Sequence, residues 1–185
     1  MGQIPTRLKG WRRHWQSRTH TLDDPVALLS VHRDIECSVN GMIVIDQAVN
    51  LPLVDEREAG YDRLELSPED IEIIHLDNGM ADHFMACETV YIYVAREDKT
   101  LPQQGLLLQS YLDAVLQGHF NEFGEEGVAH FVSTTRGFDR GVILDRHQPR
   151  YPRSVSLSDL EIQLFDEALR LAGVKDFVPL DAISG

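Results

Sequence analysis

The spacing of apolar residues changes about halfway along this 185-residue chain, and that change restricts the folds it can adopt. In the first half, apolar segments are short, alternating or rich in β-branched residues, as in strands. In the second half, apolar residues recur three and four positions apart, as on one face of a helix. Strands followed by helices predict an α+β fold rather than alternating βαβ units.

Strand-like segments follow one another through the first half. We expect strands over residues 8–15, 26–32, 35–45, 61–66 and 87–94. The segment 71–76 either continues the strand at 61–66 or pairs with it, and residues 77–79 carry a turn signal. Gly41 marks a bulge or a close approach of the backbone within its strand.

Helical spacing covers most of the second half. We expect helices over residues 106–120 and 125–134, and irregular backbone over 136–157. The last helix begins after Ser158, which forms a capping box with Glu161, and it ends near Gly173. The final dozen residues are expected to form a loosely docked tail.

Length and composition indicate one domain, residues 1–185, with a sizeable core. Cys37 and Cys87 have no metal-binding spacing and lie in apolar, strand-like segments, so we expect buried free thiols and a reducing cytoplasm. No apolar run is long enough to span a bilayer, and no apolar segment follows the basic start to make a secretory signal. We therefore expect a cytoplasmic protein that has no membrane partner.

Charge is unevenly distributed along the chain. Residues 1–20 carry a net charge of +5, whereas the remainder carries −18, for a total of −13. A body this acidic disfavours nucleic acid as a partner. Trp11 and Trp15 lie among the basic residues, a combination found in RNA-binding segments. The same segment alternates apolar and polar residues, and we favour a half-buried strand.

Three carboxylates, Asp55, Glu56 and Glu58, crowd the end of a short helix that is expected to stop at Gly60. The helix dipole disfavours negative charge there, so a carboxylate with apolar neighbours would have a raised pKa. Such a group can transfer protons near neutral pH. The alternative is that these carboxylates are solvated and that Arg57 neutralises one of them.

Several segments, in this order, are similar to one protein family. They are residues 7–15, 40–45, 54–61, 109–113 and 145–153. Together they resemble the bacterial branch of the γ-glutamylcyclotransferase-like proteins. The resemblance implies a small α+β fold built on a mixed β-barrel with helices around it.

The reaction implied by the resemblance releases an amine or peptide from a γ-glutamyl group, which cyclises to 5-oxoproline. Glutathione, γ-glutamyl amino acids and γ-glutamylamines all share the recognised half, and the family needs no metal or organic cofactor. The family's essential glutamate falls on Glu58. The chemistry suits a glutamate, because the substrate's own ammonium must lose a proton before it can attack, and the leaving amine must gain one.

Further candidates for substrate binding are Tyr93, Tyr111 and Arg153. Either tyrosine could instead pack in the core or against the sheet. Arg153 could pair with a substrate carboxylate, because arginine binds carboxylates in a bidentate way. The alternative for its loop is structural: Arg146 or Arg153 ties the loop to an acidic face.

The sequence departs from the family at its start, because no Tyr-Gly-Ser loop is present. That loop grips the γ-glutamyl group in the family. We expect a chain that starts late, a shortened member, or a member in which another segment takes the role of the loop. A missing first strand would leave an open sheet edge, through which the chain could form a homo-oligomer. The alternative function is therefore an inactive module that binds small ligands or another protein.

Other chemistries have weaker support. His75, Asp77 and His83 match no metal-site spacing, so we expect no metal. Ser110, Ser133 and Ser154 lack the strand-to-helix turn that exposes a nucleophilic serine, and no cysteine lies at a helix start beside a histidine. No phosphate-binding glycine loop is present.

Overall fold

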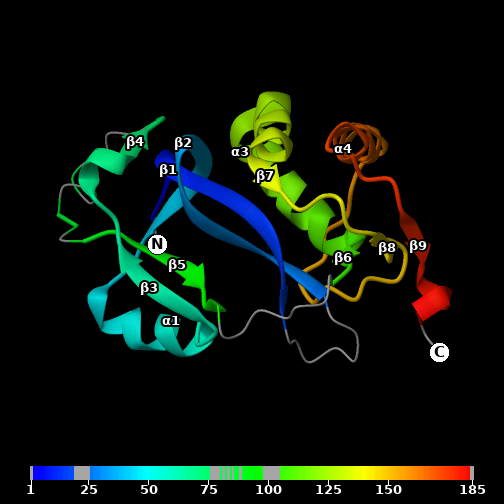
Figure 1. Ribbon diagram of the computed structural model, residues 1–185. Helices are drawn as coiled ribbons and strands as arrows, with labels where there is room; N and C mark the ends of the chain where they lie inside the picture. Colours follow the sequence, from blue (N-terminus) through cyan, green and yellow to red (C-terminus); the bar gives the residue numbers. More distant parts are fainter. Residues whose placement is uncertain are drawn as a thin grey trace. The chain divides into compact units, whose positions relative to one another are not determined.

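The computed structural model describes residues 2–18, 26–75, 80, 82, 84, 86–87, 89–97 and 105–183. These residues form a mixed α+β structure, in which most strand residues precede the two long helices, as the sequence predicts (Figure 1). The strands are β1 (Gly2–Arg18), β2 (Val26–Ile45), β3 (Tyr61–Glu65), β4 (Ile71–Ile73), β5 (Tyr91–Ala95), β6 (Leu107–Leu108), β7 (Thr135–Arg136), β8 (Val142–Leu144) and β9 (Phe177–Pro179). The helices are α1 (Leu51–Arg57), α3 (Gln109–Thr134) and α4 (Asp159–Leu171), with short 3₁₀ helices η1 (Ala48–Asn50), η2 (Pro68–Asp70) and η4 (Leu180–Ile183).

The chain divides into two compact units that share its two longest strands. Unit 1 contains Met1–Arg12 and Val31–Lys99, and unit 2 contains Arg13–Ser30 and Thr100–Gly185. The described strands form open sheets. In the largest sheet, β1 lies between β2 and β4. The closed barrel implied by the family resemblance is not seen among the described residues.

Unit 1 contains a core on one side of a two-stranded ribbon. The ribbon is the antiparallel pair of β3 and β5. Ile92 and Val94 of β5 pack against buried Trp11 and Leu66. The segment 71–76 was expected to continue the strand at 61–66 or to pair with it, and both alternatives are wrong: η2 separates β3 from β4, and β4 pairs with β1. A strand this short carries little pairing information of its own, so tertiary contacts decide its partner.

Unit 2 is built around α3, α4 and the parallel strands β6, β8 and β9. Its core collects aromatic rings, with Trp15 edge-on to Phe131 and Phe138. The break expected between helices at 106–120 and 125–134 is confirmed, because α3 is interrupted at Gly124, where φ is 64°, although the first helical part begins at Gln109 rather than at residue 106. A positive φ of this kind suits glycine and accounts for the break.

The ends of α4 agree with the sequence analysis. Ser158 and Glu161 form the expected capping box, and Gly173 follows the helix with a φ of 93°. The expected loose tail is wrong, because β9 pairs with β8 and η4 follows it.

The N-terminal strand is half-buried, as its alternation predicts. Trp11 and Trp15 are 1% and 2% exposed, so neither indole is available to stack on RNA bases. The strands expected at 26–32 and 35–45 are one continuous strand, β2. Cys37 is a buried free thiol as expected, while Cys87 is free but only partly buried. None of the described helices is both long and apolar enough to cross a membrane.

Candidate functional site

The segment that carries Glu58 is a short helix followed by a turn into β3. Helix α1 ends at Arg57, three residues before the expected stop at Gly60, and Glu58 is its C-cap with φ −96° and ψ 25°. The Glu58 N–H still donates to the Val54 carbonyl at 2.9 Å, as in a helix. Residues three apart share a helix face, so Glu58 lies on the same side of α1 as Asp55.

Asp55 joins α1 to the β3–β5 ribbon. Its carboxylate accepts hydrogen bonds from the Tyr93 hydroxyl at 2.7 Å and from Arg63 Nη1 at 2.6 Å. The two donors are direct partners across the ribbon, so their side chains lie on one face of it. Burial raises the pKa of Tyr93, and its hydrogen bond to Asp55 raises it further, so the phenol stays protonated and donates.

The two faces of the β3–β5 ribbon have different surroundings. Ile92 and Val94 point into the core of unit 1, whereas Tyr91 and Tyr93 alternate with them and point to the opposite side. The guanidinium of Arg63 lies over the Tyr91 ring, 4.7 Å from its centre. We call Asp55, Glu58, Arg63, Tyr91 and Tyr93 the α1–ribbon cluster.

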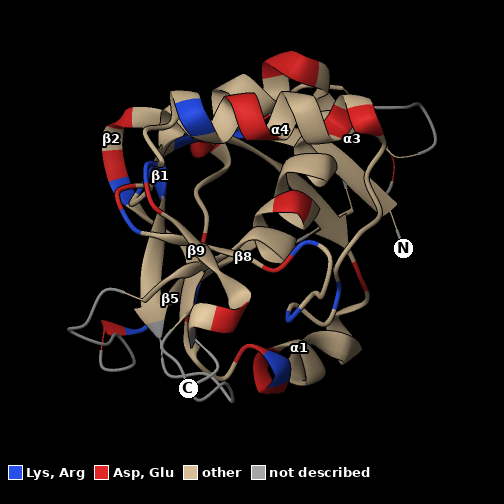
Figure 2. Cartoon of the chain, turned by 90° about the vertical axis from the view of Figure 1, so that its right-hand side faces the viewer, with Lys and Arg blue, Asp and Glu red and all other residues tan. Residues whose placement is uncertain are grey.

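Glu58 is partly buried, with 29% of its side chain exposed, and it is paired with Arg57. Arg57 Nε donates to Oε1 at 2.9 Å, so the structure contains the neutralising arginine that the sequence analysis gave as an alternative. No hydrogen bond from the described part of the chain reaches Oε2. Figure 2 shows the acidic and basic residues of α1 side by side.

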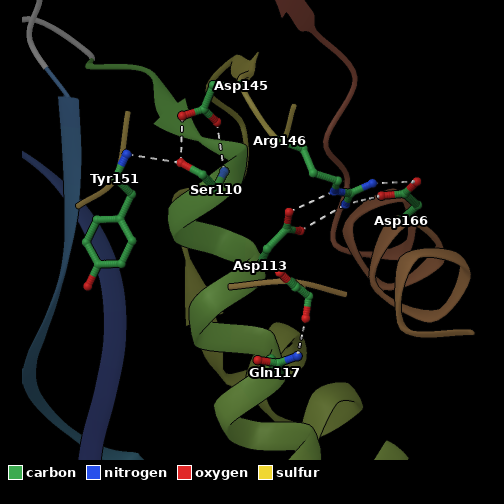
Figure 3. A network of polar contacts seen from close by, with 8 residues as sticks. Ser110, Asp113, Gln117, Asp145, Arg146, Tyr151 and Asp166 are labelled. Atoms are coloured by element: carbon green, nitrogen blue, oxygen red, sulfur yellow. Dashed lines mark hydrogen bonds and ion pairs between the residues drawn. The ribbon is translucent and has the colours of Figure 1, made fainter. Parts of the chain in front are cut away.

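A second polar network lies in unit 2 and holds the loop after β8. The Asp145 carboxylate is fully buried and accepts hydrogen bonds from the Ser110 N–H at 2.8 Å and the Ser110 hydroxyl at 2.6 Å (Figure 3). It also accepts from the Arg150 N–H at 3.0 Å. The N-cap residue of α3, Leu108, has no polar side chain. Asp145 therefore caps α3 from outside the helix, where the dipole favours an anion.

Arg146 lies between two carboxylates in the same network. It makes a bidentate pair with Asp113, at 2.7 and 2.9 Å, and it donates to Asp166 of α4 at 2.8 Å (Figure 3). Burial raises the pKa of Asp113, and the hydrogen bonds from Arg146 oppose that rise. The loop is thus tied down by an Asp–Arg lock, which is the structural alternative that the sequence analysis left open.

The predicted catalytic residue and the residues predicted to bind substrate fall into both units. Glu58 and Tyr93 belong to unit 1, and Tyr93 contacts α1 through Asp55. Tyr111 and Arg153 belong to unit 2 and share a neighbour there, Tyr151. The Tyr111 ring is 4.6 Å from the Tyr151 ring, and the Arg153 guanidinium is 5.7 Å from it.

Tyr111 also lies edge-on to Trp15, which is the packing role given as its alternative. Of the histidines and acids weighed as metal ligands, Asp77 and His83 lie outside the described residues. Within the described ranges, no three His, Cys, Asp or Glu side chains are grouped so as to hold a metal ion.

Neither Arg63 nor the role of Asp55 was predicted from the sequence. The three-residue spacing from Asp55 to Glu58 was visible, but the partners of Asp55 come from the pairing of β3 with β5. No protein-family model matches the sequence, and no curated protein matches it.

Proposed function

We propose that this chain is a γ-glutamylcyclotransferase-type enzyme that releases 5-oxoproline from a γ-glutamyl amine or peptide. The proposal includes the family's fold and a cytoplasmic location. It is supported by the ordered segments that resemble the family and by the two free thiols, which suit a reducing compartment.

The observation that carries the proposal is the position of Glu58. Its carboxylate is partly buried, and the described residues leave one of its oxygens without a hydrogen bond. Glu58 follows Asp55, which contacts the ribbon, by three residues. Arg63 and Tyr93 present polar groups on the face of the ribbon that α1 covers. A carboxylate placed between water and fixed polar groups can accept a proton from a bound ammonium.

The proposed reaction needs one proton carrier. Glu58 takes a proton from the substrate's α-ammonium, and the freed amine attacks its own γ-carbonyl carbon to form the ring C–N bond. The tetrahedral centre then collapses: Glu58 returns the proton to the leaving nitrogen and the bond from the γ-carbon to that nitrogen breaks. The ring nitrogen gives its second proton to the released amine, which departs as an ammonium. Because ring closure is intramolecular, holding the substrate in a folded shape supplies much of the rate.

The test is 5-oxoproline release by the full chain from glutathione and γ-glutamyl-alanine. We expect Glu58→Gln to lower the rate by about 100-fold or more, because proton transfer by a positioned side chain contributes that much. Glu56→Gln is the matched control, because Glu56 is an exposed acid on the same helix. Full activity in Glu58→Gln, or no release by the folded wild-type chain, would refute the proposal.

A second candidate is binding without turnover. The ion pair with Arg57 favours it, because it occupies one oxygen of the carboxylate that would carry the proton. Saturable binding of γ-glutamyl-alanine without 5-oxoproline release would support this second function.

A further inference from the structure

We propose that Arg63 binds the free α-carboxylate of the ligand, so that the α1–ribbon cluster selects compounds with an intact α-amino-acid end. The inference rests on the proposed function for the identity of the ligand. It adds a residue and a selectivity that the resemblance does not assign.

Arg63 is held in place on two sides. Its Nη1 donates to Asp55 at 2.6 Å, and its guanidinium plane lies over the Tyr91 ring. Asp55 is itself fixed by the Tyr93 hydroxyl at 2.7 Å. An arginine oriented in this way loses less conformational entropy on binding than a free one.

Most of the hydrogen-bond donors of Arg63 remain available to a ligand. A guanidinium carries five N–H groups on Nε, Nη1 and Nη2. Nη1 donates to Asp55 and Arg63 also interacts with the Tyr93 hydroxyl, which leaves the other N–H groups for a ligand. The Arg63 side chain is 32% exposed, so the head group is accessible to a ligand. The edge formed by Nε and Nη2 has the geometry that pairs with a carboxylate through two parallel hydrogen bonds.

The charges of Glu58 and Arg63 complement those of an α-amino-acid end. An α-amino-acid end carries an ammonium and a carboxylate on one carbon atom. The cluster offers Glu58 for the ammonium and Arg63 for the carboxylate, and the two protein groups lie on elements that Asp55 joins. A γ-glutamyl compound with a free α-carboxylate matches both protein charges. The same compound with an α-carboxamide in place of the carboxylate matches only Glu58.

The test compares two probes that differ only in this group, L-glutamate and L-isoglutamine. Neither has a γ-amide, so neither is turned over by the proposed reaction. Calorimetric titration of the full chain should show tighter binding of L-glutamate, by about tenfold or more, as a hydrogen-bonded charge pair contributes. Arg63→Gln should reduce that preference to about twofold and leave the affinity for L-isoglutamine unchanged.

Two further variants separate recognition from structure. Arg63→Lys keeps the charge but loses the bidentate edge, so it should retain part of the preference. Arg170→Gln removes the same charge from an exposed ion pair on α4 and should retain all of it. The inference is overturned if Arg63→Gln keeps the preference, if it weakens both probes equally, or if the folded wild-type chain binds neither.

These outcomes are independent of the cyclisation assay. A preference that depends on Arg63 in a chain that releases no 5-oxoproline would retain the carboxylate site and reject the proposed reaction. Release of 5-oxoproline that depends on Glu58, without a preference that depends on Arg63, would retain the proposed reaction and reject the carboxylate site.

Discussion

Acidification from pH 6.5 to pH 5 is expected to destabilise this protein through a single histidine on α3. The Nδ1 atom of His119 is buried and has no hydrogen-bond partner among the described residues. Burial, together with the nearby charges of Arg13 and His130, lowers the pKa of His119 from 6.5 to about 3. The folded protein therefore holds this imidazole neutral at a pH where the unfolded chain would protonate it.

The direction of the effect follows from proton binding. Between pH 6.5 and about 3 the unfolded state binds the extra proton, so the free energy of unfolding falls as the pH falls. Each pH unit in that window costs about 1.4 kcal/mol, which gives about 2 kcal/mol between pH 6.5 and 5. Above pH 6.5 His119 is neutral in both states and makes no such contribution.

The assay is urea unfolding of the wild type and of His119→Phe at several pH values, followed by fluorescence of the buried tryptophans. Phenylalanine keeps a ring beside Phe131, which lies 4.7 Å from the imidazole, and removes the titrating group. We expect the wild type to lose about 2 kcal/mol more than the variant between pH 6.5 and 5. The matched control is His147→Phe, because His147 is exposed, and it should follow the wild type. Parallel curves for the wild type and His119→Phe would refute the reasoning.

Three further predictions concern stability, each measured as the free energy of unfolding in urea. Asp113→Asn should cost about 3 kcal/mol, because it leaves the buried side of Arg146 without its carboxylate, whereas Asp166→Asn, at a half-exposed carboxylate, should cost less than about 1 kcal/mol. Equal losses of unfolding free energy in Asp113→Asn and Asp166→Asn would contradict the proposed role of the buried Asp113–Arg146 pair. Ser158→Ala should cost about 1 kcal/mol through the lost cap of α4, and an unchanged midpoint would contradict it. Gly173→Ala should cost about 1 kcal/mol, since its φ of 93° disfavours a side chain, and a stabilised variant would show that the backbone relaxes.

Features that depend on neighbouring residues were predictable. The capping box of Ser158 and Glu161 spans four positions, and the glycine after α4 lies where a helix stop was expected. The half-buried alternation around Trp11 and Trp15 was equally local. In each case a residue and its closest neighbours in the chain determine the geometry, so no distant partner is needed.

Pairings between distant segments were not predictable in the same way. The short strands β4 and β9 pair with β1 and β8, and their few residues do not specify a partner. The cap of α3 is also distant, because Asp145 lies 35 positions from Ser110. When the capping side chain comes from a distant part of the chain, the sequence next to the helix does not reveal it.

Some features of the candidate site follow from the local sequence, and others depend on contacts between distant segments. The sequence by itself determined that Glu58 ends a short helix before a strand and shares a helix face with Asp55, because both follow from helical spacing. Only the tertiary structure decided that Arg63 and Tyr93 meet at Asp55, because that depends on the register of β3 with β5 and on α1 covering the tyrosine face. A register shift of one residue would turn these side chains to the opposite face, and no local pattern specifies it.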